Sequence, residues 1–224
     1  MSGGIRPAEG VLDEHIRSHG ETRENLWRLA RVRVTQGLLE RPGRAALERF
    51  AEGRALGMRC LDLSPGFRQR RVQRGLEEAL RFIDDAQVPC AAWASLGWAR
   101  WVHIMGGDAA STDLDDLESL ARHVALVGDA ETRSVGLWSQ ALTHLARPPW
   151  AKRDDAMARS MMERAVRVAP QERWRALDLL TLVVLPAQDL DQVGELARAL
   201  EESDPRYPED EIATEQFWEL LAEE

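Results

Sequence analysis

The chain has 224 residues, with 29 Lys and Arg against 38 Asp and Glu, which gives a formal net charge of −9 at pH 7. A content of 44% hydrophobic and 30% charged residues indicates a folded globular protein and excludes a disordered one. The acidic balance argues against a nucleic-acid-binding protein, which normally carries a basic face. We also expect no membrane span, because no apolar stretch approaches the roughly 18–20 residues that one needs.

Helical periodicity runs through the whole chain, whereas strand-like alternation is essentially absent. Ala, Leu, Arg and Glu, which are good helix formers, supply most residues, and Gly and Pro fall between the periodic segments. We therefore expect an all-α fold, with residues 1–21 as an N-terminal extension containing a short helix and residues 22–224 as a single domain. The predicted helices lie near residues 10–17, 22–39, 44–62, 67–84, 88–105, 112–127, 131–146, 154–168, 171–184, 188–202 and 210–222.

Regular short helices joined by short turns are typical of α-solenoids, whose sequences carry internal repeats. Residues 93–97, with the sequence Trp-Ala-Ser-Leu-Gly, match part of the first helix of a tetratricopeptide repeat, and residues 158–170 match part of the second. Small residues such as Gly97 would let paired helices approach closely, while Trp93 and Met162 would fill the gaps. The repeat spacing is irregular, so the pattern predicts a tetratricopeptide-like α-solenoid of about ten or eleven antiparallel helices, with degenerate repeats.

Five segments in this order resemble a known family: residues 25–31, 60–66, 92–101, 163–170 and 200–210. The family is the T component associated with tripartite ATP-independent periplasmic (TRAP) transporters, whose members are degenerate tetratricopeptide-like helical proteins. The resemblance implies a non-enzymatic scaffold that engages a periplasmic solute-binding protein. It also implies a homotrimer that can hold an apolar small molecule in a central pore. The implied location is periplasmic for a chain whose leader has been removed, and cytoplasmic otherwise.

Tryptophan is unusually frequent, with eight residues against one tyrosine and four phenylalanines. At 100° per residue, Trp93 and Trp101 share a broad helix face, whereas Trp98 is 140° away from Trp93. One interpretation is that Trp93 and Trp101 pack in the core. The other is that Trp98, Trp101 and Trp150 line a groove or pore, because aromatic side chains are common binding anchors.

Arginines concentrate between residues 68 and 81, where Arg70, Arg74 and Arg81 share a helical face through spacings of four and seven residues. The face could be a solvated one, with Glu77 and Glu78 as partners within the helix. Alternatively it could dock an acidic surface, such as the C-terminal half of a neighbouring subunit. Residues 1–112 carry a net charge of +3 (17 basic minus 14 acidic) and residues 113–224 carry −12 (12 minus 24).

Catalytic and metal-binding patterns are weak. Adjacent carboxylates such as Asp84 and Asp85 point about 100° apart on a helix, so they do not converge as an acid–base pair. His103 with His123 or His144 could form a metal site, but lone histidines are the usual case. We therefore expect no enzyme activity, no metal and no cofactor.

The two cysteines leave one question open. Cys60 and Cys90, 30 residues apart, could form a disulfide in an oxidising compartment or could be two small buried helix residues. Two other functions remain as alternatives to the T component. One is a cytoplasmic tetratricopeptide adaptor between proteins, and the other is a helical metal-binding protein or enzyme.

Overall fold

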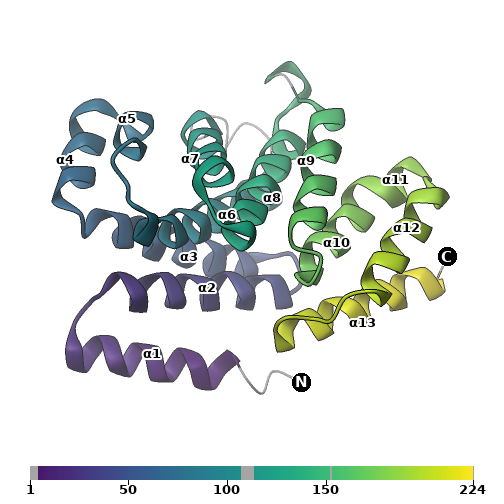
Figure 1. Ribbon diagram of the computed structural model, residues 1–224, viewed down its shortest axis with the longest axis horizontal. Coiled ribbons are helices and arrows are strands. Elements are labelled where there is room, and N and C mark those ends of the chain that lie inside the picture. The colour runs from purple at the N-terminus through teal and green to yellow at the C-terminus, as the bar shows by residue number, and fades with distance from the viewer. Residues whose placement is uncertain (1–4, 107–113, 152, 224) are drawn as a thin grey trace.

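The computed structural model describes residues 5–106, 114–151 and 153–223, and within these ranges all regular secondary structure is helical (Figure 1). This confirms the predicted all-α class. The α-helices are α1 (Ile5–His19), α2 (Arg23–Leu39), α3 (Arg44–Asp62), α4 (Pro65–Arg74), α5 (Leu76–Leu80), α6 (Val88–Met105), α7 (Leu114–Val127), α8 (Ala130–Ala146), α9 (Asp155–Val168), α10 (Arg173–Leu179), α11 (Leu185–Ala187), α12 (Leu190–Glu201) and α13 (Pro208–Glu223). Three shorter turns of helix are η1 (Asp85–Gln87), η3 (Pro149–Ala151) and the π-helical η4 (Leu180–Val184).

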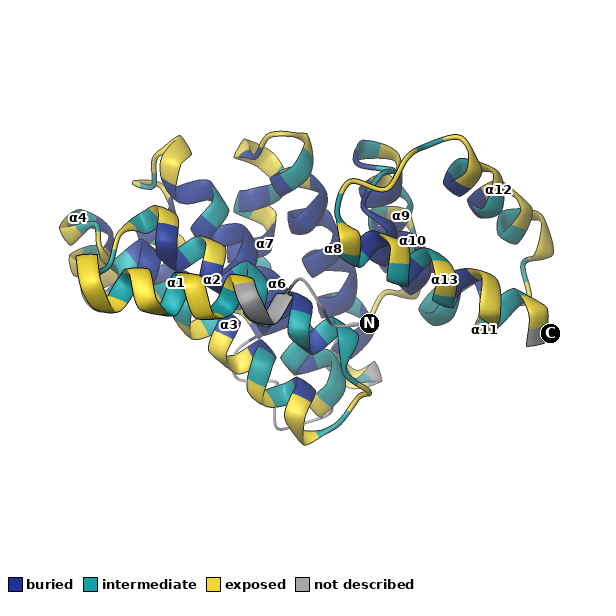
Figure 2. Cartoon of the chain, turned by 90° about the horizontal axis from the view of Figure 1, so that it is seen from below, coloured by how far each residue is buried: buried dark blue, intermediate teal, exposed yellow. Residues whose placement is uncertain are grey.

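Helix α6 lies at the centre of the molecule and packs against α2, α3, α7 and α8. Helix α8 in turn packs against α7 and α9, and α10 contacts α9 and α13. Figure 2 shows that buried residues concentrate in α6, α8 and α10, whereas α1, α12 and α13 keep broad exposed faces. Among the described residues, no helix is long and apolar enough to cross a bilayer.

The backbones of α3 and α6 approach closely because glycines occupy their crossing. A Cβ atom at Gly57 of α3 would lie 2.7 Å from both the Ala94 backbone N and the Cys90 carbonyl O of α6. A Cβ atom at Gly97 of α6 would lie 2.8 Å from the Phe50 carbonyl O of α3. The expectation that Gly97 permits close helix packing is therefore confirmed.

A disulfide joins the same two helices. Cys60 of α3 and Cys90 of α6 are fully buried and bonded, with their Cα atoms 5.7 Å apart, inside the usual range for such a bond. The enclosed segment, residues 61–89, contains α4 and α5. The disulfide therefore links the two ends of this segment, which lies between the packed helices α3 and α6 in the sequence.

The prediction of one continuous helix over residues 67–84 is wrong. Helix α4 ends at Arg74 because Gly75 adopts a φ of 88°, which favours glycine and breaks the helical path. Helix α5 then ends at Leu80, so Arg81 lies outside both helices.

Two further predicted elements differ in detail. The helix predicted over residues 171–184 begins at Arg173 and changes at Leu180 into a π-helical turn, and Pro186 lies in the short α11 that follows. Helix α1 is longer than the predicted 10–17, and Arg33 of α2 pairs with its Glu9. The predicted helix start at residues 112 and 113 lies outside the described residues.

Replacing Gly57 with Ala should destabilise the protein by about 1–3 kcal/mol, because the added methyl group would force α3 and α6 apart. Gly194→Ala is the matched control, since nothing lies within 4 Å of a Cβ atom there. That variant should gain about 0.5–1 kcal/mol from helix propensity. Urea unfolding of both variants checks the opposite signs, and equal effects would contradict the close-packing argument.

Candidate binding site

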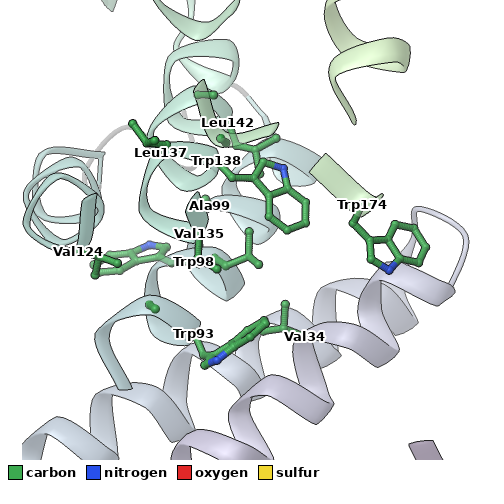
Figure 3. Packing of buried hydrophobic residues seen from close by; sticks show 14 of the residues in the cluster. Val34, Trp93, Trp98, Ala99, Val124, Val135, Leu137, Trp138, Leu142 and Trp174 are labelled. Atoms are coloured by element: carbon green, nitrogen blue, oxygen red, sulfur yellow. The ribbon is translucent and has the colours of Figure 1, made fainter. Parts of the chain in front are cut away.

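Four buried indoles come from helices α6, α8 and α10, and in this view the Trp98 ring extends toward Val124, away from Trp174 (Figure 3). Trp93 and Trp98 come from α6, Trp138 from α8 and Trp174 from α10. Their exposed fractions are 8%, 4%, 3% and 7%, so all four residues are almost wholly buried.

Arginine side chains stack on three of these indoles. The Cζ atom of Arg31 lies 5.5 Å from the Trp93 ring centroid, and that of Arg54 lies 3.5 Å from the Trp98 ring. The Trp138 ring has two such neighbours, Arg100 of α6 and Arg175 of α10. Burial away from water strengthens this cation–π attraction. The arginine–tryptophan cluster is defined by Trp93, Trp98, Trp138, Trp174, Arg31, Arg54, Arg100 and Arg175, with Arg100 at 4.8 Å and Arg175 at 5.4 Å from the Trp138 ring.

Asp178 of α10 joins three helices through its carboxylate. It forms an ion pair with Arg100 of α6, and its Oδ2 accepts a hydrogen bond from Trp138 Nε1 of α8 at 2.5 Å. The side chains of Arg100 and Asp178 are 12% and 9% exposed. Because charged hydrogen bonds are stronger than neutral ones, this carboxylate fixes how α6, α8 and α10 meet.

A second set of charges extends the cluster to α2 and α13. Arg175 Nη1 lies 2.9 Å from Glu172 Oε2, and Arg31 Nη2 lies 2.9 Å from Glu209 Oε1. The Arg31 guanidinium also stacks on Tyr207, 3.6 Å from its ring centroid. Burial opposes the charged form of Arg31, but the nearby Tyr207, Glu209 and Glu172 together raise its pKa.

Several buried hydrogen-bond donors of the cluster have no acceptor within the described residues. They are Nε1 of Trp98 and Trp174, and Nε of Arg100 and Arg175. One buried acceptor of the same region, Glu172 Oε1, also has no donor. Native interiors pair nearly all such groups, so these atoms are the part of the cluster whose hydrogen bonds are not made within the described residues.

Asp210 connects the start of α13 to the start of α10. Its Oδ1 accepts from the Arg173 backbone N at 3.0 Å, and its Oδ2 accepts from the Tyr207 backbone N at 3.1 Å. Asp210 is 1% exposed. Burial, with the neighbouring charge of Glu172, raises the pKa of Asp210 to about 7 despite these two hydrogen bonds.

The three tryptophans predicted to line a groove or pore occupy different environments. Trp98 is interior and belongs to the arginine–tryptophan cluster. Trp101 is half-buried and packs against the core, whereas Trp150 lies in η3 and is 71% exposed.

The prediction that Arg70, Arg74 and Arg81 share one helical face is wrong, because Arg70 and Arg74 lie in α4 whereas Arg81 follows the end of α5. Arg70 of α4 donates to the Gly66 carbonyl O at 3.2 Å and stacks on Phe82, 3.5 Å from its centroid. Arg81 pairs with Glu78 at 3.0 Å, and Arg74 is exposed at the end of α4. The predicted partner Glu78 is therefore engaged, although not within one continuous helix.

The histidines considered for a metal site are His103, His123 and His144. Burial lowers the pKa of all three, so their imidazoles stay neutral to lower pH than free histidine. Within residues 5–106, 114–151 and 153–223, no group of three or more His, Cys, Asp or Glu side chains could hold a metal ion.

A separate pocket of about 370 Å³ lies between α1, α2 and α3. Its lining includes the apolar side chains of Ile16 and Leu29 together with several charged side chains. Those charges are already paired, Arg59 with Glu21 and Arg33 with Glu52 at 3.2 Å. The pocket therefore offers apolar surface but few uncommitted polar groups.

Sequence patterns alone do not identify most of the cluster. Arg100, Trp138 and Asp178 are widely separated in sequence and belong to no shared motif. The frequency of tryptophan is the one signal that points toward the region, and it does not indicate which indoles meet. No protein-family model matches the chain, and no curated protein sequence matches it.

Replacing Asp178 with Asn should destabilise the protein by about 3–5 kcal/mol, because the buried Arg100 charge would lose its partner. Glu48→Gln is the control, since Glu48 pairs with Arg44 at the surface and should change stability by less than about 0.5 kcal/mol. Urea unfolding measures both variants. A loss below about 1 kcal/mol for the Asp178 variant would show that the ion pair does not hold the three helices together.

Stability should fall as the pH rises toward 7 because of Asp210. Its pKa is higher in the folded protein than in the unfolded chain, so the stabilisation is complete below about pH 4 and is lost as the pH rises through about 7. The free energy of unfolding, measured from pH 5 to pH 8, should decline more steeply in the wild type than in Asp210→Asn. Parallel curves, whatever their vertical offset, would contradict this assignment.

Proposed function

We propose that this protein is a non-enzymatic binding scaffold of the kind that the TRAP-transporter T component represents, with its helices arranged as a tetratricopeptide-like α-solenoid. The packing of α6 on α3 and α8, and of α8 on α7 and α9, supports this proposal. In a solenoid each helix pair buries its apolar face against its neighbours in sequence.

The arginine–tryptophan cluster is the observation that carries the proposed binding function. Indole faces offer rigid apolar contact area, and guanidinium groups and indole N–H groups offer donors that fix orientation. Apolar side chains would stabilise a core at least as much as these charges do, because buried ion pairs contribute little net stability. We infer that three ion-paired arginines beside these indoles serve recognition.

The proposed location is the periplasm, and the proposed partners are a periplasmic solute-binding protein and further copies of this chain in a homotrimer. The disulfide between Cys60 and Cys90 supports an oxidising compartment, because such bonds persist there and are rare in the cytoplasm. The exposed Arg74 and the half-buried Arg70 on α4 supply a surface for an acidic partner.

Native mass spectrometry of the purified, non-reduced protein tests this proposal. We expect a trimer that retains a small molecule, and we expect co-purification with a solute-binding protein when the two are expressed together. The same protein after unfolding, dialysis and refolding is the control, because it should form the trimer without the retained mass. A ligand-free monomer that captures no solute-binding protein would contradict the proposal.

A further inference from the structure

We propose that the pocket between α1, α2 and α3 binds a single uncharged alkyl chain, such as that of a straight-chain alcohol. The pocket lies within one copy of the chain, so this inference goes beyond the proposed function and depends neither on the trimer nor on the arginine–tryptophan cluster. Three observations carry it: the volume of the pocket, an apolar lining that is still partly in contact with water, and lining charges that are already paired.

The pocket exists because α1 covers α2 without filling the space beneath it. Figure 1 shows α1 lying along α2 at the edge of the molecule. None of the described side chains of α1, residues 8–19, is buried. The resulting volume of about 370 Å³ is at the lower end of the roughly 300–1,000 Å³ that is typical of ligand pockets. It therefore suits a small ligand rather than a large ring system.

The apolar lining comes from all three helices. Leu26 and Leu29 of α2 are almost wholly buried, 1% and 4% exposed. Ile16 of α1 and Leu56 of α3 are only half-buried, and Ala55 of α3 is exposed. A ligand in the pocket would remove this remaining apolar surface from water, which is favourable in proportion to the area buried. None of the ten described residues of the lining is aromatic, so the lining favours an aliphatic chain over a stacked ring.

The charged side chains of the lining pair with one another. Arg59 Nε donates to Glu21 Oε2 at 2.8 Å. Arg33 pairs with Glu52 at 3.2 Å and with Asp13 at 3.7 Å. A charged ligand would have to break one of these pairs or lose its water without gaining a partner, and both cost free energy. The formal charge of the lining is −1 (two basic minus three acidic), which disfavours an anion in particular. The pocket therefore favours an uncharged ligand.

Isothermal titration calorimetry with four probes tests the proposal. The probes are 1-hexanol, 1-heptanol, 1-octanol and octanoate, each added to the purified, oxidised protein. We expect the affinity of the alcohols to rise about fourfold with each methylene group, as the burial of one CH₂ group predicts. Octanoate should bind at least about tenfold more weakly than 1-octanol, because its carboxylate would find no free cation in the lining. Absence of saturable binding, or affinities that do not change with chain length, would overturn the proposal.

Two variants that fill the pocket locate the site. Ile16→Trp adds a large side chain from α1 and Ala55→Phe adds one from α3, and each should weaken 1-octanol binding at least about tenfold. Val11→Trp and Ala45→Phe are the matched controls on the same two helices. Both Val11 and Ala45 are exposed and neither lines the pocket, so these variants should bind 1-octanol like the wild type.

The outcomes separate this inference from the proposed function. Circular dichroism melting curves identify a variant that fails to fold, and the variant on the other helix then decides. Unchanged 1-octanol binding in a folded Ile16→Trp or Ala55→Phe variant would overturn the assigned site, and octanoate that binds as tightly as 1-octanol would overturn the uncharged class. A monomer that binds 1-octanol in this pocket would support the inference while contradicting the proposed trimer. A trimer that binds no alcohol would overturn the inference and leave the scaffold proposal standing.

Discussion

The close contact between α3 and α6 is the constraint on which the rest of the molecule depends. Gly57 and Gly97 remove the side chains that would hold the two backbones apart, and the Cys60–Cys90 disulfide joins the helices at one end of the contact. Helix α6 then occupies the centre and is covered by α2, α7 and α8. Since α6 also carries Trp93, Trp98 and Arg100, the same contact places one wall of the candidate site.

The candidate site places charge where the core would otherwise be apolar. Removing Arg100 and Asp178 from water costs several kcal/mol per ion, which the pair recovers only through good geometry and further hydrogen bonds. Trp138 supplies one such bond to Asp178. The Nε–H groups of Arg100 and Arg175 have no acceptor within the described residues, so this recovery is incomplete.

Helix α10 connects this site to the C-terminal part of the chain. It is buried on all sides and carries Arg175 and Asp178 inward, while its start is held to α13 through Asp210. The π-helical turn, residues 180–184, follows the segment directly, and Thr181 Oγ1 donates to the Leu177 carbonyl O at 2.9 Å. Such turns are rare and occur often at functional sites, because they change the direction of side chains along a helix.

By itself the sequence determined the helical class, most helix positions and the role of Gly97, because periodicity, Gly and Pro act locally along the chain. The sequence also showed that tryptophan is unusually frequent, but it did not show which indoles lie close together. The sequence pattern did not predict the break at Gly75, because a glycine can end a helix but can also continue one. Only the tertiary structure brought Arg100 and Asp178 together, since burial and ion pairing depend on helices that are distant in sequence and adjacent in space.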